Sequence, residues 1–205
     1  MSPAGILGYG CAQPSKLVTS AEVAARYDLT SDWIVERTGV ESRRVLDLEK
    51  GETLLDLAAA SARDALAVAG RSAEELDTVI VATITPDNVF PAQAVALAAE
   101  IGVPGRAVVY DLSAACTGFV TALGQAAGAI ESGRSQLALV VGADALSRVT
   151  PHDDPKSAPL FGDAAGAVVV GPVESGGIGP LVGGFDHQYR ILYSERDDGN
   201  VIRMR

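Results

Sequence analysis

The apolar residues of this chain occur either in continuous runs or at helical spacing. Continuous apolar runs over 78–83 and 136–142 predict buried strands of a sheet that is covered on both faces. Helices are expected over 52–69, over 92–101 and from Cys116 to Gly133, where apolar residues recur at helical spacing. Strands that alternate with helices predict an α/β layered domain with a largely parallel sheet.

Shorter elements are expected between these segments. Further apolar runs predict strands over 5–10, 107–112, 167–170 and 177–182. Short helices are predicted over 21–27, with Ser20 as the capping residue, and from a cap within Thr30-Ser31-Asp32 to Gly39.

Cys116 is the candidate nucleophile of the chain. The apolar run from Ala107 ends in small residues, and the cysteine then opens a helix. Unpaired N–H groups and the positive end of the helix dipole at such a turn favour thiolate over thiol. Small neighbours leave room for a reactant, although a small buried hydrophobe is the common alternative for a free cysteine.

Trp33 and Arg37 form a second candidate site. Trp33 is the only tryptophan, and Arg37 follows it by four positions, so the two side chains share a helix face. The alternative is a packed indole beside a solvated arginine.

Composition limits the classes of function. A chain of 205 residues with 48% hydrophobic content can bury one substantial core. The net charge of −10 argues against a nucleic-acid partner. Apolar runs are too short for a membrane span, no secretory leader is expected, and two cysteines are too few for a disulfide framework. A cytoplasmic setting is therefore expected.

Four segments together resemble the β-ketoacyl-acyl carrier protein synthase III family of the thiolase superfamily. They occur in the family's order and cover residues 33–40, 82–87, 111–119 and 161–167. The resemblance implies a thiolase-like α/β fold, with a first βαβαβ-type half of layered α/β/α architecture. This half would span 1–172, and 173–205 would begin the second half.

The resemblance also implies an activity. Cys116 would accept an acyl group from a thioester, and a decarboxylative Claisen condensation with malonyl-acyl carrier protein would follow, in fatty acid or polyketide biosynthesis. Two alternatives remain open: transfer of the acyl group to a hydroxyl or amine acceptor in secondary metabolism, or a non-catalytic partner subunit. Acyl-coenzyme A or acyl-acyl carrier protein would be substrates, and neither a separate cofactor nor a metal is expected.

Further site residues follow from the same resemblance. Trp33 and Arg37 would sandwich the adenine of coenzyme A, and Lys156 lies next to the position where relatives place a second arginine. Phe90 would limit the acyl pocket from across a homodimer interface. Arg37, Arg43 and Arg44 are the candidate basic cluster for anionic substrates.

The condensation step needs groups from a second half. In the family, a histidine, an asparagine and a glycine amide come from that half, and neither His152 nor His187 lies in the corresponding motif. The chain is therefore expected to be a fragment or one subunit of a split enzyme, inactive in condensation by itself.

Overall fold

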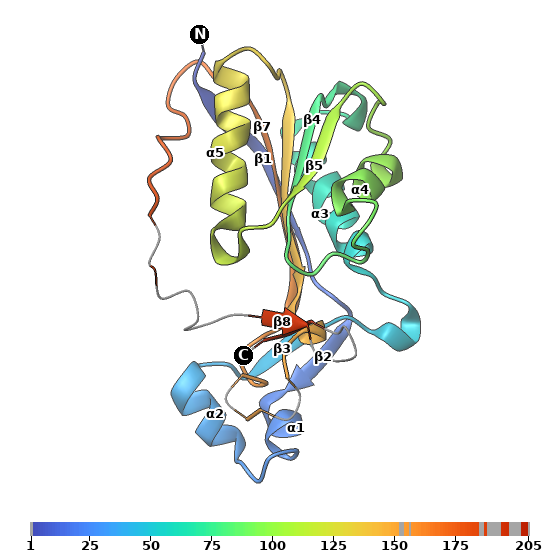
Figure 1. Ribbon diagram of the computed structural model, residues 1–205, viewed down its shortest axis with the longest axis vertical. Helices are drawn as coiled ribbons and strands as arrows, with labels where there is room; N and C mark the ends of the chain where they lie inside the picture. The colour runs from blue at the N-terminus through green and yellow to red at the C-terminus, as the bar shows by residue number, and fades with distance from the viewer. Residues whose placement is uncertain are drawn as a thin grey trace. The chain divides into compact units, whose positions relative to one another are not determined.

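The computed structural model describes residues 2–151, 154–155, 157–184 and 187, with the backbone of 194–196 and 202–204 (Figure 1). Contacts divide the chain into two compact units. Unit 1 comprises 1–12, 53–144 and 164–182, and unit 2 comprises 13–52, 145–163 and 183–205. The boundary between halves at 172/173 stays a prediction.

A five-stranded mixed sheet is the centre of unit 1. Its strands, in spatial order, are β1 (Ala4–Ala12), β7 (Asp163–Pro172), β6 (Ala138–Ala145), β4 (Thr78–Ala82) and β5 (Val108–Leu112). β4 pairs in parallel with β5 and β6, whereas β1 pairs antiparallel with β7. The predicted apolar runs of these strands are therefore confirmed as one sheet.

The strand predicted over 177–182 is wrong. Within unit 1 this segment is irregular, although Ile178 donates its N–H to the Ala4 carbonyl at 2.7 Å. Gly176 just before the segment and Gly177 at its first position have φ of 75° and 129°, a backbone region that is incompatible with extended strand geometry.

Helices cover both faces of the sheet (Figure 1). α3 (Leu54–Ala69) and α4 (Gln93–Ile101) lie on one face, and α5 (Gly118–Glu131) lies on the other. α3 approaches β1 closely, because a Cβ on Gly8 would lie 2.4 Å from the Ala65 carbonyl oxygen. Glycine in β1 and alanine in α3 therefore set this packing.

The core of unit 1 follows the continuous apolar runs. Val79, Ile80, Val81, Leu139, Val140 and Val141 are completely buried in adjacent parallel strands. Side chains from both faces of these strands are covered, as the absence of alternation in the sequence predicts.

Unit 2 contains short elements. β2 (Lys16–Thr19) pairs antiparallel with β3 (Ser42–Val45), and β8 (Ser194–Arg196) pairs antiparallel with β9 (Ile202–Met204). The helices are α1 (Ser20–Ala24) and α2 (Ser31–Thr38), with 3-10 turns at Leu48–Lys50 and Leu146–Arg148.

Thr19, rather than the predicted Ser20, caps α1. The Thr19 hydroxyl accepts the Glu22 N–H at 3.2 Å, and the Glu22 carboxylate accepts the Thr19 N–H at 2.6 Å. Ser20 instead donates its hydroxyl to the Val40 carbonyl at 2.6 Å, so it joins α1 to the segment before β3.

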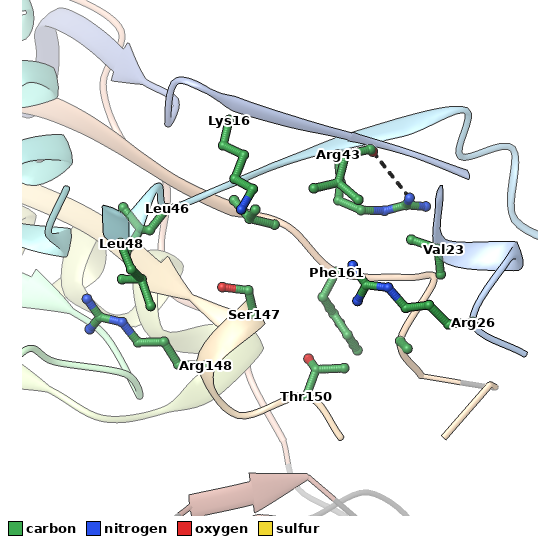
Figure 2. Close-up of a pocket in the computed structure, with 13 residues that line it drawn as sticks. Lys16, Val23, Arg26, Arg43, Leu46, Leu48, Ser147, Arg148, Thr150 and Phe161 are labelled. Atoms are coloured by element: carbon green, nitrogen blue, oxygen red, sulfur yellow. Dashed lines mark hydrogen bonds between the residues drawn. The ribbon is translucent and has the colours of Figure 1, made fainter. Parts of the chain in front are cut away.

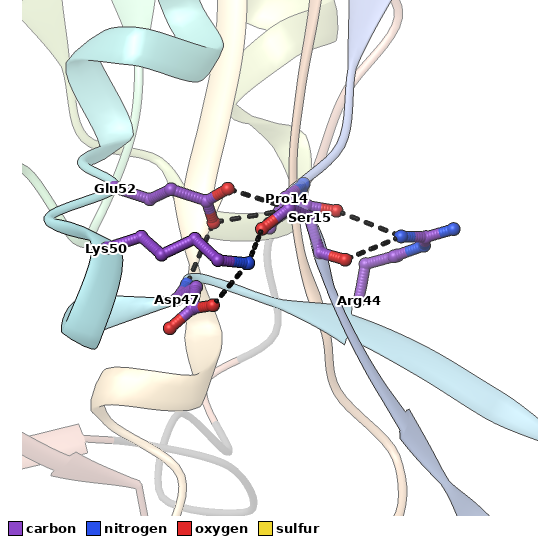
Figure 3. Close-up of polar contacts among 6 residues, drawn as sticks. All are labelled: Pro14, Ser15, Arg44, Asp47, Lys50 and Glu52. Carbon is purple, nitrogen blue, oxygen red and sulfur yellow. Dashed lines mark hydrogen bonds and ion pairs between the residues drawn. The ribbon is translucent and has the colours of Figure 1, made fainter.

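A cluster of polar side chains joins the residues just before β2 to the segment that follows β3 (Figure 3). The Glu52 carboxylate accepts the Ser15 N–H at 3.0 Å and the Asp47 N–H at 2.8 Å. Lys50 forms a 2.9 Å ion pair with Asp47. These contacts fix the turn that follows β3 against the residues that precede β2.

Candidate functional site

Three parallel strands of unit 1 end at the same edge of the sheet. Ala82 of β4 lies opposite Leu112 of β5 and Gly142 of β6 in the registers of the two pairs. The segments that leave these strands therefore emerge side by side. The carboxyl edge of parallel strands is the usual place for ligands in open α/β sheets.

Cys116 lies in the turn between β5 and α5. The turn is a short 3-10 segment, Ala115–Thr117, and the Cys116 side chain is exposed. Ala115 has a φ of 44°, a left-handed conformation that is uncommon for a residue with a Cβ. A strained turn between a strand and a helix is a known way to present a nucleophile above a sheet edge.

The predicted helix start is slightly displaced. α5 begins at Gly118, two positions after Cys116, and Thr117 makes no side-chain capping bond to its first turn. Thr117 instead donates its N–H and its hydroxyl to the Ala114 carbonyl, at 3.1 and 2.9 Å. The first-turn N–H groups of α5 therefore lack a hydroxyl cap from Thr117.

Glycines allow α5 to begin close to the sheet. A Cβ on Gly118 would lie 3.3 Å from the Ala82 Cβ, and one on Gly142 would lie 3.2 Å from the Phe119 ring. Larger residues at either position would push the start of α5 outward. The glycines therefore hold the cysteine turn against β4 and β6.

Asp144 fixes the loop next to the cysteine turn. At the end of β6, its Oδ1 accepts the Thr83 hydroxyl at 3.0 Å and the Ile84 N–H at 2.9 Å. The Thr85 hydroxyl donates to the same oxygen at 2.8 Å. Sequence reasoning missed this residue, although a carboxylate at the end of an apolar strand is the signal that could have found it.

The same loop is held at two further points. The Asp87 carboxylate accepts the N–H groups of Leu54 and Leu55, at 3.2 and 2.8 Å, in the first turn of α3. Asp111 of β5 accepts the N–H groups of Gln93 and Ala94, at 2.8 and 2.7 Å, in the first turn of α4. The loop is therefore ordered by its own polar residues.

Phe90 lies between these anchored points and faces outward. Its exposed fraction is 89%, and that of its neighbour Val89 is 85%. Two adjacent apolar side chains at such exposure leave a large apolar surface uncovered within the part of the chain that the structure describes.

Trp33 and Arg37 come together in unit 2, as their spacing predicts. The Thr30 hydroxyl caps α2 by accepting the Trp33 N–H at 3.1 Å, and Gly39 ends the helix with a φ of 70°. The Arg37 guanidinium carbon lies 4.3 Å from the centre of the Trp33 ring. This distance is typical of a cation–π contact.

The predicted basic cluster of Arg37, Arg43 and Arg44 is only partly available. Arg43 is 7% exposed, and its guanidinium donates to the Pro159 carbonyl at 2.8 Å. Arg44 donates to the Ser15 carbonyl at 2.8 Å (Figure 3). Both arginines therefore have structural partners on the chain itself, because backbone carbonyls approach them from distant segments.

The structure does not test the remaining residues named from the sequence, so the role of Lys156 stays a prediction. Lys156 and His152 lie outside the described residues, and His187 is exposed in an irregular segment. Within the described ranges, no helix is long and apolar enough to cross a membrane. The same residues contain no group of three His, Cys, Asp or Glu side chains suited to hold a metal ion.

The chain is similar to a known protein family. The profile of 3-oxoacyl-[acyl-carrier-protein] synthase III matches residues 110–184, which include Cys116. The β-ketoacyl-[acyl-carrier-protein] synthase III of Paramagnetospirillum magneticum is 47% identical over 165 residues, covering 80% of this chain and 50% of the relative. The Synechococcus sp. protein of the same name is 44% identical, covering 85% and 50%.

Solved structures agree with these relatives. A priming β-ketosynthase from a polyketide biosynthetic pathway has a TM-score of 0.89 at 41% identity, covering 94% of this chain and 57% of its own. The 3-oxoacyl-(acyl carrier protein) synthase III of Pseudomonas aeruginosa has a TM-score of 0.86 at 36% identity, covering 98% and 63%. The chain spans about half the length of the curated relatives that it matches. The predicted thiolase-like α/β fold is confirmed.

Proposed function

Because the chain belongs to the β-ketoacyl-[acyl-carrier-protein] synthase III family, we propose that it carries the acyl-transfer centre of a condensing enzyme. Cys116 accepts an acyl group from a coenzyme A or phosphopantetheine thioester, in fatty acid or polyketide biosynthesis. The observation that carries the proposal is the exposed cysteine on a left-handed turn at the carboxyl edge of the sheet.

The acyl transfer is a thioester exchange. The Cys116 thiolate attacks the carbonyl carbon, a new carbon–sulfur bond forms, and the donor's thiolate leaves with the electron pair of the old bond. The backbone N–H of Cys116 is a candidate donor to the negative oxygen of the tetrahedral intermediate. Such donors typically contribute about 10²–10³-fold to the rate.

The condensation is proposed for the protein together with a second thiolase-like half. Malonyl-acyl carrier protein loses carbon dioxide, and the resulting carbanion attacks the acyl group on Cys116, which releases the cysteine thiolate. The family resemblance assigns a histidine and an asparagine of the second half to this step.

The two exposed free thiols, Cys11 and Cys116, fit a reducing cytoplasm.

A homodimer is also part of the proposal. Among the described strands, β5 is the last of the sheet and pairs with β4 alone, so its other edge can pair with a second copy. Antiparallel pairing of two β5 strands would continue the sheet through both subunits. Phe90 would then reach the partner's acyl site and limit the chain length that it accepts, which its 89% exposure permits.

Intact-mass measurement after incubation with acyl-coenzyme A and acyl-carrier-protein thioesters of several chain lengths tests the acyl transfer. We expect one acyl adduct per chain, absent from Cys116→Ala and retained in Cys11→Ala. Peptide mapping should place the adduct on Cys116. An adduct that persists in Cys116→Ala would overturn the proposed role.

A further inference from the structure

A pocket of about 310 Å³ lies within unit 2 (Figure 2). β2, β3, the segment around α1 and the segment after β6 supply its walls. Neither Cys116 nor the Trp33–Arg37 pair lines this pocket, so it is distinct from both candidate sites. Its volume is at the lower end of the range of small-molecule sites.

The pocket is cationic although the protein is acidic. Lys16, Arg26, Arg43 and Arg148 line it, and no carboxylate is among its described lining residues. The chain as a whole has a formal net charge of −10. Four cations around one cavity therefore concentrate a charge opposite to that of the rest of the protein, which attracts anions.

Arg43 is the buried member of this group. It is 7% exposed and donates only to neutral acceptors that the structure describes: the carbonyls of Val18 and Pro159 and the Ser20 hydroxyl. Its Nε is buried without a hydrogen-bond partner in the described part of the chain. A buried charge that lacks a counter-charge is costly, so this site favours a bound anion.

Nearby carboxylates are engaged in other contacts. Glu22 closes the capping box of α1 with Thr19, at 2.6 and 2.7 Å. Asp47 forms its ion pair with Lys50 at 2.9 Å. Both carboxylates lie near Lys16, and Glu22 also lies near Arg26, but neither lines the pocket. The buried Asp163 carboxylate accepts the Leu46 N–H at 2.9 Å and the Ser147 hydroxyl at 2.6 Å, and it too is absent from the described lining.

The remaining lining is apolar with two hydroxyls. Ser147 and Thr150 supply the hydroxyls, and Figure 2 shows Phe161 between Ser147 and Arg26. The other apolar lining residues are Val18, Val23, Val45, Leu46, Leu48 and Ala158. Such a lining suits a ligand that combines an anionic group with an apolar body.

We propose that this pocket binds a small organic phosphate ester, whose phosphate lies among the four cations and whose apolar body contacts Phe161. Arginine matches phosphate geometry through paired N–H donors, and lysine adds a point charge. The site is a second ligand site of the chain, and it does not depend on the acyl-transfer role of Cys116.

Calorimetric titration at fixed ionic strength tests the site, with phenyl phosphate as the probe. We expect saturable binding that weakens as salt increases. Inorganic phosphate should bind more weakly because it lacks the apolar body, and phenol should not bind because it lacks the charge. The phosphate could belong to a free phosphate ester or to the 4′-phosphopantetheine arm of a substrate carrier, so 4′-phosphopantetheine is titrated as well. Tighter binding than phenyl phosphate would assign the site to substrate carriers, and equal or weaker binding to free phosphate esters.

Two exposed cations give variants that should fold. Lys16→Gln and Arg26→Gln should each lower the affinity about threefold to tenfold, and the double variant more than tenfold. Arg106→Gln, an exposed arginine that donates to the Glu74 carbonyl in unit 1, is the matched charge control and should bind normally. Cys116→Ala should also bind phenyl phosphate normally, because Cys116 does not line the pocket. The binding result is therefore independent of whether the acyl-transfer proposal holds.

Two results would overturn the site. One is the lack of saturable phenyl phosphate binding up to about 10 mM, which is weaker than the range of specific ligands. The other is equal affinity of the wild-type chain and the Lys16→Gln/Arg26→Gln double variant. Arg43→Met gives a second measurement. If this variant is folded, it should bind phenyl phosphate less tightly than the wild type.

Discussion

The guanidinium of Arg37 lies against the indole of Trp33, with 4.3 Å between the guanidinium carbon and the ring centre. Arg37 also donates to the Trp33 carbonyl at 3.3 Å, which holds it over its own helix. A planar base between the two would need about 7 Å, twice a carbon contact distance. The adenine sandwich predicted from the family resemblance is therefore closed in this structure, and adenine must displace Arg37 or use the other ring face.

We expect Arg37→Gln to change the emission of Trp33, which is the only tryptophan in the chain. Loss of the cation uncovers a ring face to water, so the emission maximum should move to longer wavelength. The free energy of unfolding should fall by about 0.5–1 kcal/mol at most, the value of an exposed cation–π contact. Arg71→Gln, which breaks an exposed ion pair with Glu75, is the control and should leave the emission unchanged.

The left-handed turn before the nucleophile gives a second prediction. Ala115→Gly should raise the free energy of unfolding by up to about 1 kcal/mol, because glycine adopts a φ of 44° without a Cβ clash. Ala115→Val should lower it, because a β-branched side chain strongly disfavours this region. Urea denaturation measures both values, and equal stability of the two variants would contradict the strained turn.

Local sequence signals explain which elements could be predicted. The apolar runs of β4 and β6, the Thr30 cap and the Gly39 terminus each depend on neighbouring residues, and all are confirmed. The shift of the α1 cap from Ser20 to Thr19 is a small error, since both hydroxyl residues are suitable caps. The strand predicted over 177–182 does not form, because no strand among the described residues pairs with this segment.

Contacts between distant residues could not be predicted in the same way. Asp87 meets the start of α3 across 32 residues, and Asp144 meets Thr85 across 59. The local sequence around Arg43 is typical of a surface cation, but Arg43 is 7% exposed and donates a hydrogen bond to the carbonyl of Pro159, which is 116 residues away. Such partners depend on the fold that brings the segments together, and the local pattern around each residue does not contain them.

Phe90 should determine which acyl chains react with Cys116 in the proposed dimer. Phe90→Ala should increase the acylation rate with long-chain donors relative to acetyl donors, because the side chain would no longer limit the partner's pocket. Its 89% exposure in one chain implies a change in folding stability within about 0.5 kcal/mol. Val89→Ala, at 85% exposure, is the control, and its chain-length profile should match the wild type.

Glu52 should contribute to the loss of stability in acid. Hydrogen bonds from Ser15, and then from the Asp47 backbone, hold the pKa of this carboxyl below its ordinary value of 4.5. The unfolded chain therefore takes up the proton first, and the stabilisation is present above pH 4.5 and lost as the pH falls through the lower folded pKa. Glu52→Gln should show a shallower fall in the free energy of unfolding below that pH. Glu49→Gln, an exposed glutamate in the 3-10 turn that precedes Glu52, provides the control for loss of charge.

The proposed dimer places β5 at the interface, and Val108 tests this placement. Val108 is 62% exposed at the start of the edge strand, so a carboxylate there should fold but would place charges of the same sign in the proposed interface. Val108→Glu should therefore shift the sedimentation equilibrium toward monomer by at least about tenfold in dissociation constant, a change of about 1.4 kcal/mol. Val68→Glu is the matched control, because Val68 is 59% exposed on α3, away from the strand edge. A Val108→Glu protein that dimerises as tightly as Val68→Glu would exclude pairing through β5, because a charge on each of the two paired strands should weaken the dimer.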